Sequence, residues 1–126
     1  MSAVTAHLVC GPPGSGKSAL IRRRVAERRA WLGFVNAADR YDEPMLRLAP
    51  SGCPCCTARV VMQVELARAL RETRPQRVLV EIVSADHLAD VERTLHRDPL
   101  GRYLMPGRPV WLPADAALTA DALERS

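Results

Sequence analysis

The feature that most constrains this chain is a glycine-rich stretch, Gly11–Ser18, set between an apolar segment and a helix-forming segment. It reads Gly-Pro-Pro-Gly-Ser-Gly-Lys-Ser and fits the pattern G-x-x-x-x-G-K-[ST]. Fixed glycines reach backbone angles closed to other residues, so that successive N–H groups can surround an anion. The following helix would direct its unpaired N–H groups and its positive dipole end at the same anion. The stretch therefore predicts a phosphate-binding loop.

Two polar side chains at the end of this loop have separate expected roles. Lys17 is expected to reach the β- and γ-phosphates of a nucleotide, and the Ser18 hydroxyl to complete the shell of a Mg²⁺ ion. All other members of the 18 Lys and Arg residues are arginine, which indicates that position 17 needs a compact ammonium group. An ordinary Gly/Pro turn is the alternative. The predicted nucleotide-binding residues are Gly11, Pro12, Pro13, Gly14, Ser15, Gly16, Lys17, Ser18 and Ala19.

The composition excludes several classes of protein. A length of 126 residues indicates one domain, and a net charge of +4 suits an anion binder without favouring nucleic acid. One Phe, two Tyr and two Trp offer no aromatic platform for stacking bases. No segment approaches the ~20 apolar residues of a membrane span, and residues 1–6 do not resemble a secretory signal. We expect a cytoplasmic protein with reduced thiols that binds neither nucleic acid nor membrane.

Strand and helix patterns alternate along the chain. The predicted strands are His7–Cys10, Phe34–Ala37, Arg77–Val83 and Pro109–Leu112, and the predicted helices are Lys17–Leu32 (ended by Gly33), Thr57–Thr73 and one capped by Ser84. Asp39–Gly52 is interpreted as a long loop. The alternation predicts an α/β fold of the P-loop NTPase type, with three layers and a small, mostly parallel sheet flanked by helices. Residues 1–113 would form the nucleotide-binding domain and residues 114–126 a weakly helical or frayed tail.

Apolar spacing predicts which face of each helix is buried. Arginines crowd the other side of the first helix, where a solvated surface is favoured over a nucleic-acid face. The predicted inward residues are Leu20, Ile21, Val25 and Leu32 on the first helix, Val60, Val64, Ala67 and Leu70 on the second, and Leu88, Val91 and Leu95 on the third, and the predicted outward arginines are Arg22, Arg23, Arg24, Arg28 and Arg29.

Three cysteines lie within four residues, at Cys53, Cys55 and Cys56. Three thiolates suit a soft ion such as Zn²⁺ or Cu⁺, but a tetrahedral site needs a fourth ligand. Water, a partner's side chain, or one of Cys10, His87 and His96 could supply it. A thiol redox switch using Cys53 and Cys55, and plain buried cysteine, are the alternatives.

Glu81 is an acidic residue within the most apolar predicted strand. A carboxylate there is costly unless it is paired or lies near a cation. In proteins with this kind of loop, an acid at the end of a neighbouring strand faces Mg²⁺ or its water. We therefore interpret Glu81 as the acid that holds a Mg²⁺-bound or attacking water. A salt bridge to a nearby arginine is the alternative.

The combination of this loop, the segment Gly52-Cys53-Pro54-Cys55-Cys56 and a buried strand carrying Glu81 resembles the CobW-type GTPases, which include zinc metallochaperones. The loop alone also looks like adenylate kinases and AAA ATPases, whereas the cysteine segment is similar to the family's G-C-x-C-C. The resemblance covers roughly Val4 to Asp115, the N-terminal nucleotide-binding domain of a truncated member. It implies GTP binding, slow hydrolysis with Mg²⁺ through Lys17 and Glu81, and nucleotide-gated delivery of Zn²⁺ held by the three cysteines to a client protein.

The sequence also departs from that family. After its second strand the family has Asn-Glu-x-Gly. This chain keeps Asn36, but Ala37 and Ala38 follow it, so the family's glutamate is missing. Ser84 replaces the glycine of the family's E-x-x-G. No N-K-x-D segment is present to recognise guanine, so GTP rather than ATP follows from the resemblance alone. A non-catalytic nucleotide- or metal-binding regulator is therefore the second hypothesis, and an ATP-dependent small-molecule kinase the third. The question whether a homodimer forms, with the second subunit completing the pocket for the nucleotide base, is left open.

Overall fold

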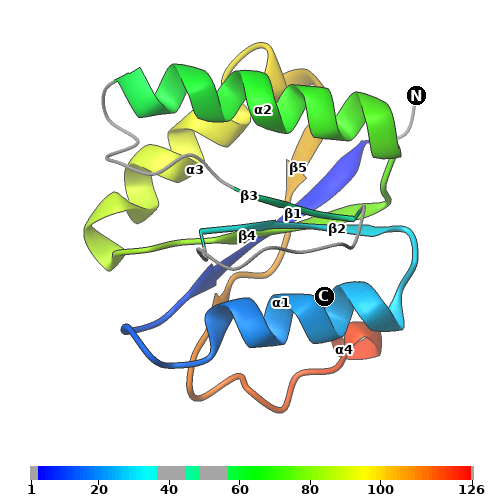
Figure 1. Cartoon of the computed structure of the whole chain (residues 1–126), viewed down its shortest axis with the longest axis vertical. Coiled ribbons are helices and arrows are strands. Elements are labelled where there is room, and N and C mark those ends of the chain that lie inside the picture. The colour runs from blue at the N-terminus through cyan, green and yellow to red at the C-terminus, as the bar shows by residue number, and fades with distance from the viewer. Residues whose placement is uncertain (1–2, 37–44, 49–56, 126) are drawn as a thin grey trace.

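The computed structural model describes residues 3–36, 45–48 and 57–125, which form three layers with a sheet between two layers of helices (Figure 1). The sheet has six strands in the order β3-β2-β4-β1-β5, with β6 also paired to β1, and every pairing is parallel. The predicted α/β class is confirmed. The strands are β1 (Val4–Cys10), β2 (Trp31–Val35), β3 (Leu46–Leu48), β4 (Arg77–Glu81), β5 (Leu104–Pro106) and β6 (Val110–Trp111).

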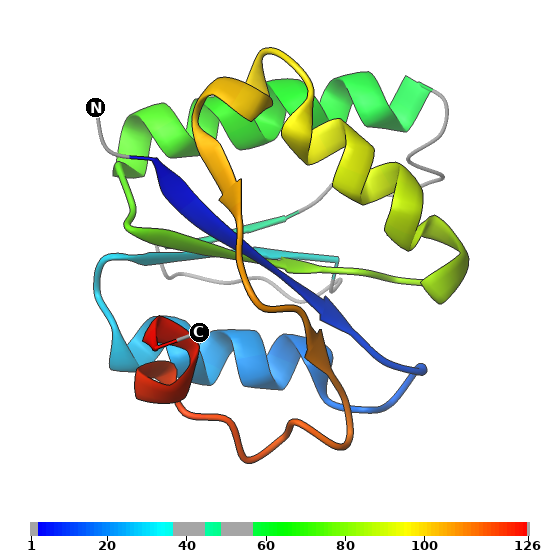
Figure 2. The ribbon, with the colours of Figure 1, turned by 180° about the vertical axis from the view of Figure 1, so that it is seen from behind.

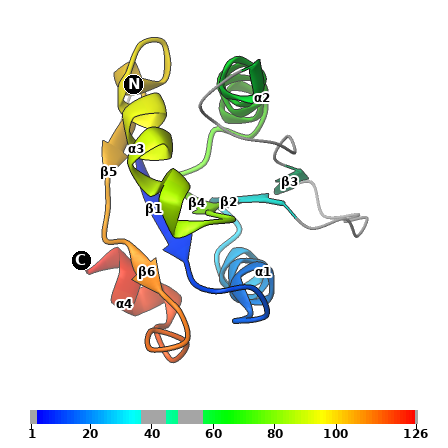
Figure 3. The same cartoon turned by 90° about the vertical axis from the view of Figure 1, so that its left-hand side faces the viewer.

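The helices divide between the two faces of the sheet. α1 (Lys17–Glu27) and α4 (Ala120–Glu124) cover one face, and α2 (Thr57–Thr73) and α3 (Leu88–His96) cover the other, as the end view shows (Figure 3). The short 3₁₀ turns η1 (Ala85–His87) and η2 (Leu100–Arg102) flank α3. From behind, β5 and β6 follow one another beside β1 (Figure 2).

Each face of the sheet carries its own hydrophobic core, because side chains alternate along the strands. On β1, Leu8 faces α2 and α3, whereas Val9 faces α1 and α4. The core under α2 and α3 includes Phe34, Leu66, Val78, Val80, Val91 and Leu95, and that over α1 and α4 includes Leu20, Ile21, Trp31, Leu79, Val110 and Leu123.

The prediction for the end of the first helix was wrong. α1 ends at Glu27, Arg28 is already extended (φ −131°, ψ 104°), and β2 begins at Trp31. Gly33 lies inside β2 and is not a helix terminator. A Cβ there would come within 2.6 Å of both Ile21 Cγ2 and Leu46 Cδ2, so this glycine serves a close approach between β2, α1 and β3.

The edges of the sheet also differ from the prediction. Part of the expected loop Asp39–Gly52 forms β3, which pairs with β2 from Gly33↔Leu46 onward. β5 was not predicted at all, and β6 covers only Val110–Trp111. The strands β3, β5 and β6 have two or three residues, too few to show a periodic pattern. The central strand β4 ends at Glu81, before its predicted end at Val83.

α2 has the predicted bounds but rests on a different face. Val60 and Val64, predicted to point inward, are 55% and 50% exposed, whereas Ala67 packs partly and Leu70 fully against the core. The buried face runs through Met62, Leu66, Ala69 and Leu70. The helix carries two apolar stripes, and contact with the sheet selects one of them.

Two arginines, one in α1 and one directly after it, do more than face solvent. Arg24, predicted to point outward, is only 5% exposed and donates a hydrogen bond to Glu27. Arg28 pairs with Asp121 and Glu124 of α4. The predicted tail therefore contains a helix that docks on α1, and Thr119 caps it by accepting a hydrogen bond from the Ala122 N–H.

The buried His7 joins α4 to the sheet through a partly buried polar cluster. Its Nδ1 donates to the Arg108 carbonyl at 2.8 Å, so Nε2 must accept from the Arg77 guanidinium, also at 2.8 Å. Arg77 also donates to the carbonyls of Leu123 and Glu124 at the end of α4. Burial lowers the pKa of His7 below 6.5, with the nearby Arg77 charge acting in the same direction.

This arrangement predicts that acid destabilises the fold through His7. Below about pH 6.5 the unfolded chain binds a proton at His7 that the folded chain excludes, so the free energy of unfolding falls as the pH falls. His7→Gln should show a smaller fall between pH 7.5 and 5.0 in urea unfolding. The exposed His96→Gln serves as the control and should keep the wild-type pH dependence, whereas equal slopes for wild type and His7→Gln would contradict the assignment.

No helix among the described residues combines the length and apolar character needed to cross a bilayer.

Candidate functional site

The glycine-rich loop joins β1 to α1 and has two glycines in the left-handed region, Gly14 (φ 80°) and Gly16 (φ 89°). Gly16 is the N-cap of α1, and its carbonyl accepts the hydrogen bond of Leu20 N–H at 2.9 Å. A Cβ at Gly14 or Gly16 would meet no described atom within 4 Å. The backbone conformation therefore requires these glycines, and the space around them is open to a ligand.

Gly11 is required for a different reason. A Cβ there would lie 2.6 Å from Ser15 Oγ and 3.0 Å from the Leu112 carbonyl oxygen, so the loop packs tightly against the segment after β6. The Ser15 hydroxyl is buried in this contact and has no hydrogen-bond partner within the described part of the chain. The start of the loop is thus held by packing and its second half by glycine geometry.

Lys17 lies in the first turn of α1 and is 7% exposed. Its Nζ donates to the Gly11 carbonyl at 2.7 Å, which folds the side chain back over the loop. An ammonium group has three protons, and among the described residues this is the single recorded hydrogen bond of Nζ. Lys17 can therefore donate to an anion placed in the loop while still bonded to Gly11.

Glu81 is the last residue of β4 and lies beside Asn36, which directly follows β2. Glu81 Oε1 accepts from the Asn36 main-chain N–H at 3.2 Å, and the Asn36 side-chain amide donates to the Glu81 carbonyl at 3.1 Å. No arginine among the described residues forms an ion pair with Glu81. The pairing that this half-buried carboxylate needs comes from Asn36 and not from the predicted alternative, a salt bridge.

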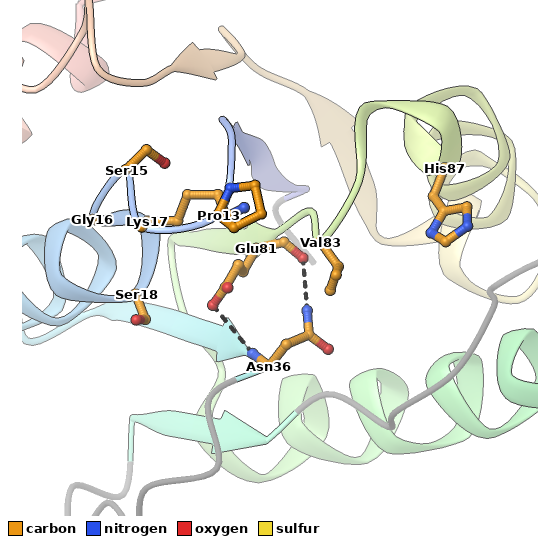
Figure 4. Close-up of a pocket in the computed structure, with 10 residues that line it drawn as sticks. Pro13, Ser15, Gly16, Lys17, Ser18, Asn36, Glu81, Val83 and His87 are labelled. Carbon is orange, nitrogen blue, oxygen red and sulfur yellow. Dashed lines mark hydrogen bonds between the residues drawn. The ribbon is translucent and has the colours of Figure 1, made fainter.

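A cavity of about 710 Å³ opens where the loop meets the carboxyl ends of β2 and β4 (Figure 4). It brings together Lys17 and Ser18 from α1 with Glu81 from β4. The Ser18 hydroxyl and the Glu81 carboxylate are the oxygen donors that Mg²⁺ prefers, and the lysine and loop suit phosphate, so the residues present fit both groups. The described lining residues are Pro13, Gly14, Ser15, Gly16, Lys17, Ser18, Asn36, Glu81, Val83 and His87.

The lining differs from the predicted site in a few positions. Gly11, Pro12 and Ala19 are not among the described lining residues, although Gly11 accepts the hydrogen bond of Lys17. Val83 was predicted to be buried in the strand, but it is 55% exposed and lines the cavity. Asn36, which carried no predicted role, also lines it. Its pairing with Glu81 joins residues 45 positions apart, which no local sequence pattern reveals.

The predicted zinc ligands Cys53, Cys55 and Cys56 lie outside the described residues. Within the described residues, no three His, Cys, Asp or Glu side chains gather as a metal site. Cys10, a candidate fourth ligand, is 1% exposed in the core beneath α2 and α3. Burial raises the pKa of its thiol, an effect that Lys17 partly offsets, so Cys10 is poorly suited to ligate as a thiolate.

Comparisons with known proteins agree on one family. The model of the CobW/HypB/UreG nucleotide-binding domain matches residues 5–100. The zinc chaperone YeiR of Escherichia coli (strain K12) is 30% identical over an alignment of 93 residues, which covers 64% of this chain and 28% of YeiR. The chain thus aligns with little more than a quarter of that relative's length. No solved structure matches it.

Proposed function

Since this chain belongs to the CobW/HypB/UreG family of nucleotide-binding domains, we propose that it binds GTP with Mg²⁺ in the cavity between α1 and β4. The observation that carries the proposal is the shared lining of that cavity by Lys17, Ser18 and Glu81. An ammonium group, a hydroxyl and a carboxylate beside a glycine-rich loop are the groups that hold a polyphosphate and its cation.

Each of these residues has its own part in the proposal. The loop N–H groups and the start of α1 bind the phosphates, and Lys17 donates to the β- and γ-phosphate oxygens. Ser18 and Glu81 would hold Mg²⁺, Ser18 through its hydroxyl and Glu81 through a water molecule. When bound, Mg²⁺ neutralises charge that develops on the phosphate oxygens. Glu81 would also accept a hydrogen bond from the attacking water and orient it during slow hydrolysis.

The cargo in this proposal is zinc. Cys53, Cys55 and Cys56 would bind Zn²⁺ as a transferable ion, and a client protein would receive it. The relative named a zinc chaperone supports this part, together with the three closely spaced thiols. The nucleotide-binding unit of the proposal is residues 1–113, with a homodimer and a cytoplasmic location as further expectations.

A specific observation favours a second candidate, a nucleotide-binding regulator without turnover. Ser84, which replaces the expected glycine, is extended (φ −139°, ψ 139°), and its hydroxyl caps η1 by accepting from the Asp86 N–H. A residue engaged in capping has less freedom to follow a γ-phosphate than a glycine would have. If Ser84 stays in this capping position, the protein is expected to bind nucleotide without hydrolysing it.

A titration of the whole chain with fluorescent GTP and ATP, with Mg²⁺ or with EDTA, tests the nucleotide assignment. We expect GTP to bind more tightly than ATP and Mg²⁺ to strengthen the binding. A separate assay of phosphate release should show slow hydrolysis of GTP. Equal or tighter binding of ATP would refute the GTP assignment. Binding with no release above background would support the regulator instead.

The zinc assignment needs a separate measurement. We expect the purified wild type to bind one Zn²⁺ under reducing conditions and the triple variant Cys53→Ser/Cys55→Ser/Cys56→Ser to bind none. Cys10→Ala is the matched control, because it removes a thiol from the buried core and should retain zinc. Equal zinc content in wild type and triple variant would remove this part of the proposal.

A further inference from the structure

Asn36 and Glu81 join the ends of two neighbouring strands at the wall of the cavity. β2 and β4 are paired through Phe34↔Val80, so that Asn36 and Glu81 both lie beyond the last paired residues. Asn36 donates two hydrogen bonds to Glu81. The Asn36 main-chain N–H donates to Glu81 Oε1, and the Asn36 side-chain Nδ2 donates to the Glu81 main-chain carbonyl (Figure 4).

These two hydrogen bonds fix the orientation of both side chains. The Glu81 carbonyl can only accept, so the amide nitrogen of Asn36 must face it and the amide oxygen must face elsewhere. On Glu81, Oε1 is occupied by the N–H of Asn36, and Oε2 has no recorded partner among the described residues. Both side chains line the cavity, which leaves one oriented oxygen of each available there.

A glutamate at the end of a strand would otherwise move among several rotamers. Ordering such a side chain costs conformational free energy, because rotamer freedom is lost. The two hydrogen bonds oppose that freedom before any ligand binds, because one holds the carboxylate and the other holds the main chain from which it extends.

We propose that Asn36 is a positioning residue that holds the Glu81 carboxylate so that Oε2 accepts a hydrogen bond from a water ligand of Mg²⁺. The inference rests on the proposed function, because it deepens the role of Glu81 in that site. Asn36 acts through Glu81 and does not itself contact the cation. A merely structural Asn36 would instead tie the two strand ends together without affecting the cation.

Double-variant analysis separates these two roles. Asn36→Ala, Glu81→Gln and the combination of both are compared with Thr94→Ala, which removes a similar side-chain-to-carbonyl hydrogen bond on α3, away from the cavity. For each protein we measure fluorescent GTP affinity against Mg²⁺ concentration and again in EDTA. Asn36→Ala should raise the Mg²⁺ concentration for half-maximal effect about 10-fold, as loss of an outer-shell partner does.

The remaining expectations follow from action through Glu81. Affinity in EDTA should stay within about twofold of wild type in Asn36→Ala, and the double variant should lose no more than Glu81→Gln alone. Thr94→Ala should keep the wild-type Mg²⁺ dependence. Asn36→Ala keeps the main-chain N–H that donates to the carboxylate and removes only the side-chain bond to the Glu81 main chain. Without any metal, the NMR signal of the Glu81 side-chain carboxyl carbon should therefore shift in Asn36→Ala, because the main chain that carries the carboxylate is no longer held, and should stay unchanged in Thr94→Ala.

Three results would overturn the positioning role while leaving nucleotide binding intact. These are additive losses in the double variant, an equal loss of affinity in EDTA, and an unshifted Glu81 carboxyl signal in Asn36→Ala. A wild type that binds no nucleotide under any condition would overturn the proposed function and this inference together.

Discussion

Replacing Lys17 with alanine is expected to weaken nucleotide binding about 100-fold, the largest functional effect of any single substitution in the site. Hydrogen bonds to charged groups contribute up to about 3 kcal/mol, and tenfold in affinity corresponds to about 1.4 kcal/mol. Lys17 Nζ lies 2.7 Å from the Gly11 carbonyl, over the loop, and the side chain is almost fully buried. Fluorescent-nucleotide titration at fixed Mg²⁺ measures the loss directly.

Two further variants separate the charge from its surroundings. Lys17→Met keeps the buried aliphatic stem and should lose nearly as much affinity as Lys17→Ala. Arg23→Ala removes the same formal charge from the exposed surface of the same helix and should change affinity by less than about twofold. Similar losses in Lys17→Met and Arg23→Ala would mean that net charge, and not the position of the ammonium group, governs binding.

Lys17 belongs to the part of the structure that could be read from the sequence, because the evidence for it is local. The spacing of Gly14, Gly16 and Lys17 within one loop predicts backbone conformation and chemistry together, and both glycines adopt positive φ. α2 likewise has its predicted bounds, Thr57–Thr73. Glu81 was expected near the end of a strand and is the last residue of β4.

What the sequence could not decide depends on contacts between distant residues. Periodicity on α2 selected the face that carries Val60 and Val64, whereas the face that carries Met62 and Leu66 meets the sheet. The edge strands β3 and β5 exist because β2 and β1 offer them hydrogen bonds, and their own three residues carry almost no signal. The role of Asn36 depends on Glu81, 45 residues away, so only the folded chain reveals it.

Gly33 was predicted to end the first helix but lies inside β2. Replacing it should have a large effect on stability. On an uncrowded strand, Gly33→Ala would stabilise the fold by about 0.5–1 kcal/mol. Here the new Cβ would lie 2.6 Å from both Ile21 Cγ2 and Leu46 Cδ2 and 3.2 Å from Val25 Cγ2. We therefore expect Gly33→Ala to lower the free energy of unfolding by about 1–3 kcal/mol, the usual cost of overpacking a core.

Urea unfolding of Gly33→Ala shows whether the free energy of unfolding falls, as expected for a crowded site, or rises, as expected for an uncrowded strand. A second substitution identifies the atoms that cause the crowding. Leu46→Ala removes one of the two closest atoms, so Gly33→Ala should cost less in a Leu46→Ala background than in the wild type. The folded fraction of Gly33→Ala should bind nucleotide with nearly wild-type affinity, because Gly33 does not line the cavity. A stabilised Gly33→Ala, or an equal cost in both backgrounds, would mean that β2 packs against α1 and β3 with room to spare.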